Sequence, residues 1–220
     1  LAVLGGANAA ALETPEGEFE VIQFRDAALT APSTYVLSGL LRGQAGTEAA
    51  MCAPLAAGAR FVLLDGAISE IGMSDAERGL ARVWAYGPAP KPLDDVSYVR
   101  ETRSFKGIGL RPFSPVHVKA ARAAGGDIAL TWTRRTRTGG DSWEGTDVPL
   151  GEESEAYEVD IVSGGVAIRT LSASTPAATY VAASQTADFG STSFTTLTVR
   201  VVQISRAFGR GTIREATLNV

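Results

Sequence analysis

The clearest structural signal in the chain is the stretch Gly125-Gly126-Asp127-Ile128-Ala129-Leu130-Thr131-Trp132. Ile128, Leu130 and Trp132 recur at every second position, so in an extended strand their side chains point to one face. The Gly-Gly-Asp sequence before them is typical of a tight turn. This stretch therefore predicts a strand that starts directly after a turn and buries one face.

The same pattern of short strands and turns continues to the C-terminus. Tyr157, Val159 and Ile161 alternate in the same way, and Gly164-Gly165 followed by residues 166–170 predicts a β-hairpin. Residues 112–220 are expected to contain no helical stretch and seven short strands, at 116–121, 128–132, 157–161, 166–170, 179–185, 197–201 and 212–220. Strands of this number and spacing predict an antiparallel β-sandwich.

A domain boundary is expected at Arg111-Pro112-Phe113-Ser114-Pro115, because two closely spaced prolines continue neither a helix nor a central strand. Residues 1–111 are expected to form an irregular, β-rich N-terminal domain, and residues 112–220 the sandwich, so the fold class is mainly β. Within the first domain we expect strands at 19–25, 35–41, 60–65 and 79–86, a turn at Asp26-Ala27, a short helix over 47–57 and a capping box at Ser74–Glu77.

Length, charge and hydropathy exclude several classes of protein. The 220 residues, 45% of them hydrophobic, suffice for one large domain or two small ones. The net charge of −4 argues against nucleic-acid binding. The sequence has no apolar run of about 18 residues, so no transmembrane helix is expected. The chain begins with Leu1 and has no charged segment typical of a signal peptide, so we expect it to be part of a longer protein.

The residues that most often carry catalysis are scarce. Cys52 is the only cysteine and His117 the only histidine, which removes disulfides, thiolate zinc clusters and most histidine chemistry. No G-x-S-x-G elbow or phosphate-binding P-loop is present. We expect Cys52 to be a small buried hydrophobic residue and His117 a solvent-facing strand residue. The sequence thus predicts no catalytic residue, no cofactor and no enzyme activity.

Two groups of carboxylates are candidates for glycoside hydrolysis, Asp94-Asp95 and Glu152-Glu153-Ser154-Glu155. Neighbouring side chains on extended backbone point apart, and such runs are usually solvated. Asp141, Glu144 and Asp147 resemble calcium ligands, but their spacing matches no defined calcium loop. No metal site is expected.

The long polar loop over residues 134–155 contains the candidate surface contact. It consists of three arginines, a carboxylate and an indole: Arg134, Arg135, Arg137, Asp141 and Trp143. Arginine and aromatic side chains together are typical of protein interfaces and glycan-binding surfaces. The alternative is that Trp143 caps the sandwich edge while the arginines pair with Glu152, Glu153 and Glu155. The sequence leaves both open.

The second half of the chain resembles a fibronectin type III module. The resemblance rests on Trp132, on Tyr157 at the start of the next strand, and on residues 197–205 followed by Gly209-Arg210-Gly211. Leu197 stands where the family has its corner tyrosine, so that hydroxyl bond is absent. Gln203 stands at an inward-facing position, where an unpaired amide costs about 1–3 kcal/mol. We therefore predict a backbone hydrogen-bond partner for the Gln203 side chain.

A second resemblance spans nearly the whole chain. It rests on residues 20–25 (EVIQFR), 35–48 (YVLSGLLRGQAGTE), 58–65 (GARFVLLD), 112–117 (PFSPVH) and 187–190 (ADFG). These strings are similar to the C-terminal region of phage tail-tip proteins, in particular the host-specificity, TIM-barrel-containing baseplate protein of gene transfer agents. The barrel of that family lies N-terminal to the region matched, so no catalytic residue is transferred to this chain.

The resemblance implies a structural component of a phage-like tail tip or baseplate, active in assembly and host-cell attachment. It implies as partners other tail or baseplate proteins, a homotrimer within the particle and a host cell-surface glycan, with no nucleic acid and no membrane insertion. The expected location is the tail tip of a virion-like particle, extracellular after release. The alternative is a pair of non-catalytic carbohydrate-binding or spacer modules from a cell-wall-degrading enzyme.

Overall fold

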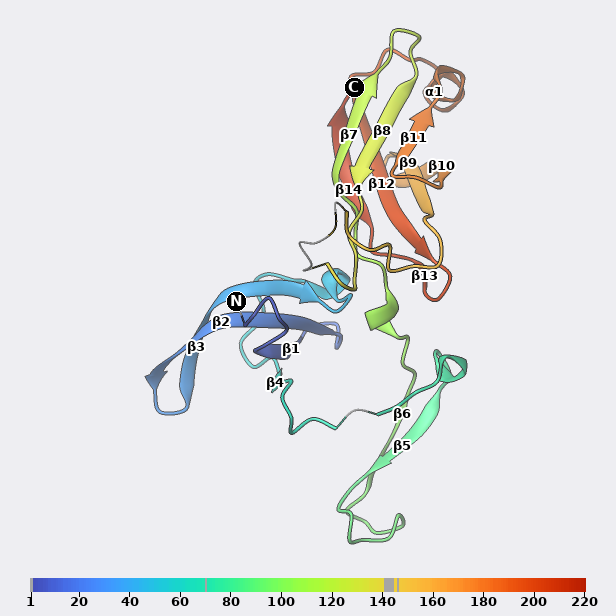
Figure 1. Ribbon diagram of the computed structural model, residues 1–220. Coiled ribbons are helices and arrows are strands. Elements are labelled where there is room, and N and C mark those ends of the chain that lie inside the picture. Colours follow the sequence, from blue (N-terminus) through green and yellow to red (C-terminus); the bar gives the residue numbers. More distant parts are fainter. Residues whose placement is uncertain (1, 70, 141–144, 146) are drawn as a thin grey trace. The chain divides into compact units, whose positions relative to one another are not determined.

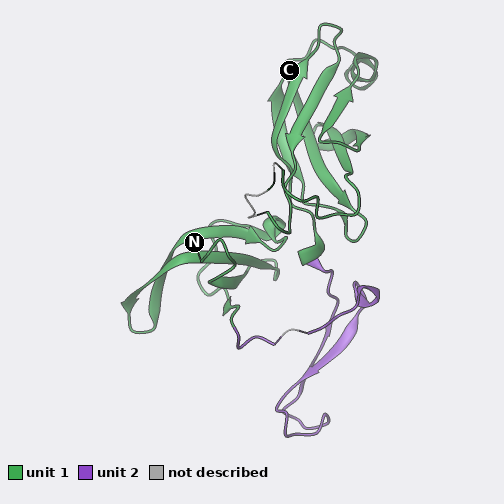
Figure 2. Cartoon of the chain, in the orientation of Figure 1, with its two compact units in different colours: residues 1–65, 109–220 green, residues 66–108 purple. Residues whose placement is uncertain are grey.

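The computed structural model describes residues 2–69, 71–140, 145 and 147–220, and most of their regular structure is antiparallel β-sheet (Figure 1). Two compact units are present: residues 1–65 with 109–220, and residues 66–108 (Figure 2). The expected boundary between residues 111 and 112 falls inside the first unit. The fold class predicted from the sequence, mainly β with antiparallel sheets, is confirmed.

The C-terminal part is a two-sheet sandwich. One sheet has the order β11-β8-β7, with β7 at Val116–Arg122, β8 at Ile128–Thr133 and β11 at Ala177–Tyr180. In the other sheet, β12 pairs with β9 on one side and β14 on the other, and β10 pairs with β9. The bounds of these strands, and of a two-residue strand β13 beside the end of β12, are β9 Tyr157–Ser163, β10 Val166–Ala173, β12 Thr196–Ser205, β13 Gly209–Arg210 and β14 Arg214–Asn219.

The alternation that predicted this sandwich is present in its core. Along β8, Ile128, Leu130 and Trp132 are buried and the residues between them are exposed. Trp132 meets the ring of Tyr157 edge-on, with ring centroids 5.1 Å apart. The predicted hairpin is also confirmed: β9 and β10 pair antiparallel, joined by Gly164-Gly165, both at positive φ.

Gln203 of β12 is buried as predicted, but its expected partner is not found. Within the described part of the chain, the Nε2 atom of Gln203 has no hydrogen-bond partner. The predicted backbone partner of the Gln203 side chain is therefore absent for its Nε2 donor among the described residues. The strand pairs through its backbone with β9, which fixes where the side chain enters the core.

A helix interrupts the predicted strand pattern. The strand expected at residues 179–185 stops at Tyr180, and α1 runs from Ala182 to Phe189, ending at Gly190 in a left-handed conformation. The expectation of no helix in this half is wrong. The helical turn buries Gln185, whose amide donates to the carbonyl oxygen of Tyr180 (2.7 Å) and accepts from Arg122 (2.9 Å).

The N-terminal sheet has the order β3-β2-β1-β4, with bounds β1 Ala9–Glu13, β2 Phe19–Ala31, β3 Thr34–Gln44 and β4 Phe61–Leu63. Its small core contains Ala10, Ile22 and Phe24. The turn expected at Asp26-Ala27 is wrong, because β2 continues to Ala31 and Asp26 pairs with Ser38. The chain instead reverses at Pro32-Ser33, where Ser33 has positive φ.

The helix expected over residues 47–57 is also wrong. Only a 3-10 turn forms there, η1 at Glu48–Ala50. Pro54 lies within the expected span, and a proline inside a helix removes a backbone hydrogen bond and clashes with the preceding turn.

The second unit is built around one hairpin, in which β5 (Arg82–Tyr86) pairs with β6 (Val99–Arg103). It also contains the 3-10 turn η2 at Asp75–Glu77, and a third such turn, η3 at Ile108–Leu110, follows. The predicted capping box is present: the Glu77 carboxylate accepts hydrogen bonds from the Ser74 N–H (3.1 Å) and hydroxyl (2.9 Å).

Candidate functional site

Two of the loop arginines hold the long loop together. Arg134 keeps only 11% of its side chain exposed and donates to the carbonyl oxygens of Pro149 (2.7 Å) and Val148 (2.9 Å). Arg137 donates to the Glu152 carboxylate at 2.9 Å and to a backbone carbonyl. These contacts join the two limbs of the loop, so both guanidinium groups are engaged within the chain.

Arg135 instead connects the loop to η1, the 3-10 turn that follows β3. Its guanidinium lies 4.8 Å from the centre of the Phe113 ring and forms an ion pair with Glu48. The other oxygen of Glu48 accepts the backbone N–H of Ser114 at 2.9 Å. Glu48 thus contacts both the proline-containing linker and the loop. Its ion pair with Arg135 joins residues that are 87 positions apart in the sequence.

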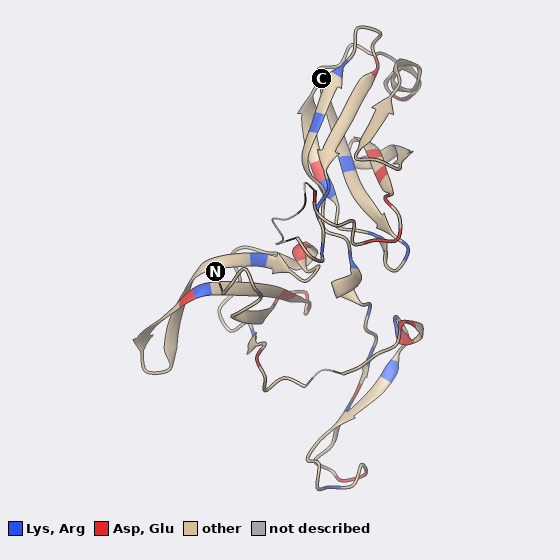
Figure 3. Cartoon of the chain, in the orientation of Figure 1, with Lys and Arg blue, Asp and Glu red and all other residues tan. Residues whose placement is uncertain are grey.

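The other two predicted contact residues, Asp141 and Trp143, lie outside the described residues. Of the predicted internal pairs, Arg137 with Glu152 is present, and Arg134 lies 3.4 Å from Glu155. Glu153 pairs with Arg206 of the sandwich instead of a loop arginine. Across the described chain, Lys and Arg are interspersed with Asp and Glu along the ribbon (Figure 3).

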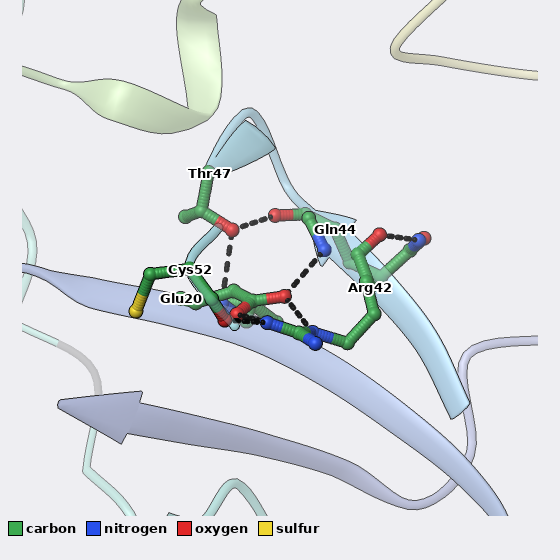
Figure 4. Close-up of polar contacts among 7 residues, drawn as sticks. Glu20, Arg42, Gln44, Thr47 and Cys52 are labelled. Carbon is green, nitrogen blue, oxygen red and sulfur yellow. Dashed lines mark hydrogen bonds and ion pairs between the residues drawn. The ribbon is translucent and has the colours of Figure 1, made fainter. Parts of the chain in front are cut away.

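A buried ion pair underlies the strings that carried the tail-tip resemblance. Glu20 of β2 is fully buried, and both its oxygens accept from Arg42 of β3, at 2.5 and 2.6 Å (Figure 4). Arg42 also donates to the carbonyl oxygen of Cys52, and the Gly43 N–H donates to Glu20 at 3.0 Å. Glu20 holds the pKa of Arg42 above its usual value, chiefly through the hydrogen bonds that the Arg42 guanidinium donates to the Glu20 carboxylate.

The turn after Arg42 is fixed by further bonds of the same network. Thr47 accepts the Val21 N–H at 2.9 Å and donates to the carbonyl oxygen of Gln44 at 2.6 Å. Gly43 has positive φ, and a Cβ there would lie 2.6 Å from the Met51 sulfur. The network therefore sets the path of the chain into η1, which presents Glu48.

Sequence analysis did not identify Glu20 as a structural residue. The signal was present: Glu20 alternates with the buried Ile22 and Phe24, so its carboxylate lies on the buried side of a strand. A carboxylate at such a position needs a paired cation, and Arg42 of the neighbouring strand provides it.

The carboxylates considered for hydrolysis are tied into local contacts. Asp95 accepts from the backbone N–H and hydroxyl of Ser97, and these bonds lower the pKa of Asp95. A general acid needs the opposite shift. Among the described residues, no group of three or more His, Cys, Asp or Glu side chains could hold a metal ion. Of the calcium-like set, Asp147 is described and pairs with Arg134.

The single histidine and the single cysteine belong to no cluster of metal-ligating side chains in the described part of the chain. His117 is exposed on β7, as predicted, and has positive φ at an irregularity in the pairing of β7 with β8. Cys52 is half-buried, so the expectation of a buried residue is wrong. Cys52 takes part in the network through its backbone carbonyl oxygen, which accepts a hydrogen bond from Arg42.

The N-terminal sheet exposes an apolar hollow of about 380 Å³, which we call the sheet hollow. Side chains from β2, β3 and β4 line it: Phe24, Ala27, Tyr35, Leu37, Phe61 and Leu63. Tyr35, Phe61 and Leu63 are themselves exposed. A contiguous exposed apolar surface of this kind is typical of a site that contacts another molecule.

Comparison with known proteins gives one family and a set of fold neighbours. The family model described as "Rcc01698-like, C-terminal" matches residues 1–62. No curated protein matches the chain in sequence. In the described part of the chain, no helix is long and apolar enough to cross a membrane.

The solved structures that are similar include fibronectin type III modules. "Structure of FN3tt mut" is 16% identical and covers 49% of this chain and 93% of its own, with a TM-score of 0.32. Rat CD45 extracellular domains d3-d4 are 12% identical and cover 89% and 94%, with a TM-score of 0.34. The FN5 domain of Drosophila Lar is 15% identical and covers 50% and 98%, with a TM-score of 0.27. The sandwich assignment therefore rests on the strand order and core given above.

Proposed function

We propose that this chain is a non-enzymatic structural component of the tail tip or baseplate of a phage-like gene transfer agent, serving assembly and host-cell attachment. Its partners are other tail or baseplate proteins, and within the particle it forms a homotrimer. The family match at residues 1–62 supports the proposal, since the family's name is associated with gene transfer agents. The resemblance of residues 20–25, 35–48 and 58–65 to tail-tip proteins supports it as well.

The observation that carries the proposal is the sheet hollow. It lies in β2, β3 and β4, almost entirely within the residues that match the family. Large exposed apolar side chains there are stabilised by a partner that removes them from water, at about 25 cal/mol for each Å² buried. An assembly role provides such a partner.

The absence of enzyme activity is part of the proposal. It is supported by the contacts of the candidate carboxylates: Glu152 and Glu153 are each paired with an arginine, and the pKa of Asp95 is lowered. Turnover of purified peptidoglycan by the chain, abolished by one carboxylate-to-amide change, would contradict this part.

The assembly role is tested by placing a charge in the sheet hollow. Tyr35→Asp, made in the protein that carries this sequence, should block incorporation into particles, because the buried carboxylate would lack a partner. Val166→Asp is the matched control, since Val166 is an equally exposed apolar strand residue in the sandwich. Particles that incorporate both variants normally would refute the assembly role of this surface.

The attachment role is tested by deleting residues 112–220 and scoring particle assembly and cell adsorption separately. Normal particles that no longer adsorb would support attachment through the sandwich. Failed assembly would make the sandwich architectural, and particles that assemble, adsorb and deliver normally would contradict both roles for this segment.

A further inference from the structure

The second compact unit contains a different kind of hollow, which we call the aromatic hollow. It has a volume of about 320 Å³ and is lined chiefly by Trp84 and Tyr86 of β5, Glu101 and Arg103 of β6, and Phe105 just beyond β6. Pockets of about 300–1,000 Å³ with aromatic walls and a few polar groups are typical of small-ligand sites. Nothing in the assembly role uses this surface.

The register of the hairpin explains why these side chains gather. Trp84 pairs with Glu101 and Tyr86 with Val99, so Trp84, Tyr86, Glu101 and Arg103 project from the same face. The Phe105 ring meets Trp84 edge-on, with centroids 5.4 Å apart and planes at 74°. The hairpin thus displays aromatic rings and charged groups side by side.

The aromatic rings are available to a ligand. Tyr86 is 53% exposed and Phe105 is 44% exposed, although both border the hollow. An isolated two-stranded hairpin is marginally stable in water, and exposed rings on it add no stability until something covers them. A ligand with an apolar face would cover them.

The polar groups form a row along the same hollow. The Tyr86 hydroxyl donates to Oε1 of Glu101 at 3.1 Å, and the Arg103 Nε donates to Oε2 of Glu101 at 2.9 Å. Glu101 raises the pKa of Tyr86, chiefly through this hydrogen bond, so the hydroxyl stays neutral. The Arg103 side chain is 61% exposed, so its guanidinium is accessible to solvent and to a ligand.

We propose that the aromatic hollow binds a neutral oligosaccharide. A pyranose ring has an apolar face of C–H groups and an edge of hydroxyl groups. The rings of Tyr86 and Phe105 would cover the face, while Arg103 would donate to ring hydroxyls and the Tyr86 oxygen would accept from them. The hollow presents these two surfaces next to each other, as such a ligand requires.

Charge and size favour this ligand over an anion or a protein. Residues 66–108 contain six Asp or Glu and six Lys or Arg, and Glu101 and Arg103 in the lining pair with each other, so the hollow offers no net positive charge to a phosphate or carboxylate. In contrast to the apolar sheet hollow, this hollow is bordered by Glu101, Arg103 and the Tyr86 hydroxyl, and its volume suits a ligand of a few rings that carries hydroxyl groups. The proposal does not depend on the tail-tip assignment.

The test is a titration of the whole 220-residue chain with chitotriose, cellotriose and maltotriose, in which calorimetry and saturation-transfer NMR measure binding. We expect saturable binding of at least one of them, weakened about tenfold by Glu101→Gln, because Arg103 then loses the carboxylate oxygen that orients its guanidinium toward the sugar. Tyr86→Ala should weaken it at least as much. The controls are Glu153→Gln and Val166→Ala, because Glu153 and Val166 are exposed residues outside residues 66–108.

The variants also separate binding from folding. Glu101→Gln keeps the size of the side chain but leaves one acceptor oxygen where Tyr86 and Arg103 each have their own. It therefore loosens Arg103 without removing a ring, and it tests the site if Tyr86→Ala unfolds the hairpin. Saturable binding lost in these variants and retained in the controls supports the proposal. No saturable binding of any of the three sugars overturns it, and so does equal binding by all four variants. A concentration-dependent dimer through this face, without sugar binding, also overturns it. None of these outcomes alters the assembly test with Tyr35→Asp.

Discussion

Arg42→Met tests the role of the buried ion pair in the N-terminal sheet. Methionine keeps most of the apolar stem but removes the donors to both oxygens of Glu20 and to the carbonyl oxygen of Cys52. The Gly43 N–H then remains as a donor to a fully buried carboxylate. Removing one partner of a buried pair costs about 3–5 kcal/mol. We expect about 3 kcal/mol here, because the Arg42 side chain keeps 29% of its surface exposed.

The same sheet provides a matched control. Arg60 binds both oxygens of Glu13, each at 2.6 Å, but its side chain is 68% exposed. Arg60→Met removes the same kind of bidentate pair from a solvated position, and should cost far less stability than Arg42→Met. The two variants therefore differ mainly in the burial of the carboxylate that is left behind.

Hydrogen exchange of the β2 and β3 amides is the appropriate assay, because a chain of two compact units need not unfold in one step. Arg42→Met should speed this exchange roughly a hundredfold. Adding Glu20→Gln to Arg42→Met should restore part of the protection, since a neutral amide is cheaper to bury than an unpaired carboxylate. Exchange no faster than in Arg60→Met would refute the reasoning, as would a double variant less protected than Arg42→Met alone.

Three further predictions concern the sandwich. Arg169 holds the pKa of Asp188 below its usual value, so the stabilisation by this ion pair is present at neutral pH and is lost as the pH falls below about 4. The difference in amide protection between wild type and Asp188→Asn should shrink over that range, and a constant difference would contradict this. Gln203→Leu removes a buried donor without a partner in the described chain, so the melting temperature should stay or rise, and a loss above about 1 kcal/mol would be contrary evidence. Gly211→Ala places a Cβ 2.9 Å from the carbonyl oxygens of Gln203 and Pro112 and should lower the free energy of unfolding, measured by thermal unfolding, by about 1–3 kcal/mol. Gly125→Ala, with open space around the added Cβ, should change it little. Equal losses of stability in the two variants would argue against crowding at Gly211.

Elements governed by local pattern could be predicted from the sequence. Ile128, Leu130 and Trp132 alternate over a strand that lies between two neighbours, and Gly164-Gly165 supplies the positive φ that its hairpin needs. Gly209-Arg210-Gly211 belonged to the fibronectin resemblance; in the structure Gly209 and Arg210 form β13, and the second glycine has a packing reason of its own. Gly211 donates to the Gln203 carbonyl oxygen and lies against Pro112, which leaves no room for a side chain.

Elements that depend on distant contacts could not be predicted in this way. Helix α1 has no side-chain N-cap and only eight residues, so its own sequence favours it weakly. Its buried Gln185 binds Arg122, 63 positions earlier, and Asp188 binds Arg169 of β10. These contacts make the helix stable where the alternation rule predicted a strand.

The candidate site shows the same division between local and distant causes. The loop pattern identified Arg134, Arg135 and Arg137 but could not say which partners they have, because each partner is set by tertiary structure. Arg135 pairs with Glu48, and Glu48 is presented by a turn that the buried pair of Glu20 and Arg42 fixes. The strings that resemble tail-tip proteins thus contain the buried network, the turn and the carboxylate that meets the sandwich. A change at Glu20 should therefore loosen Arg135 as well, although 115 positions separate the two residues.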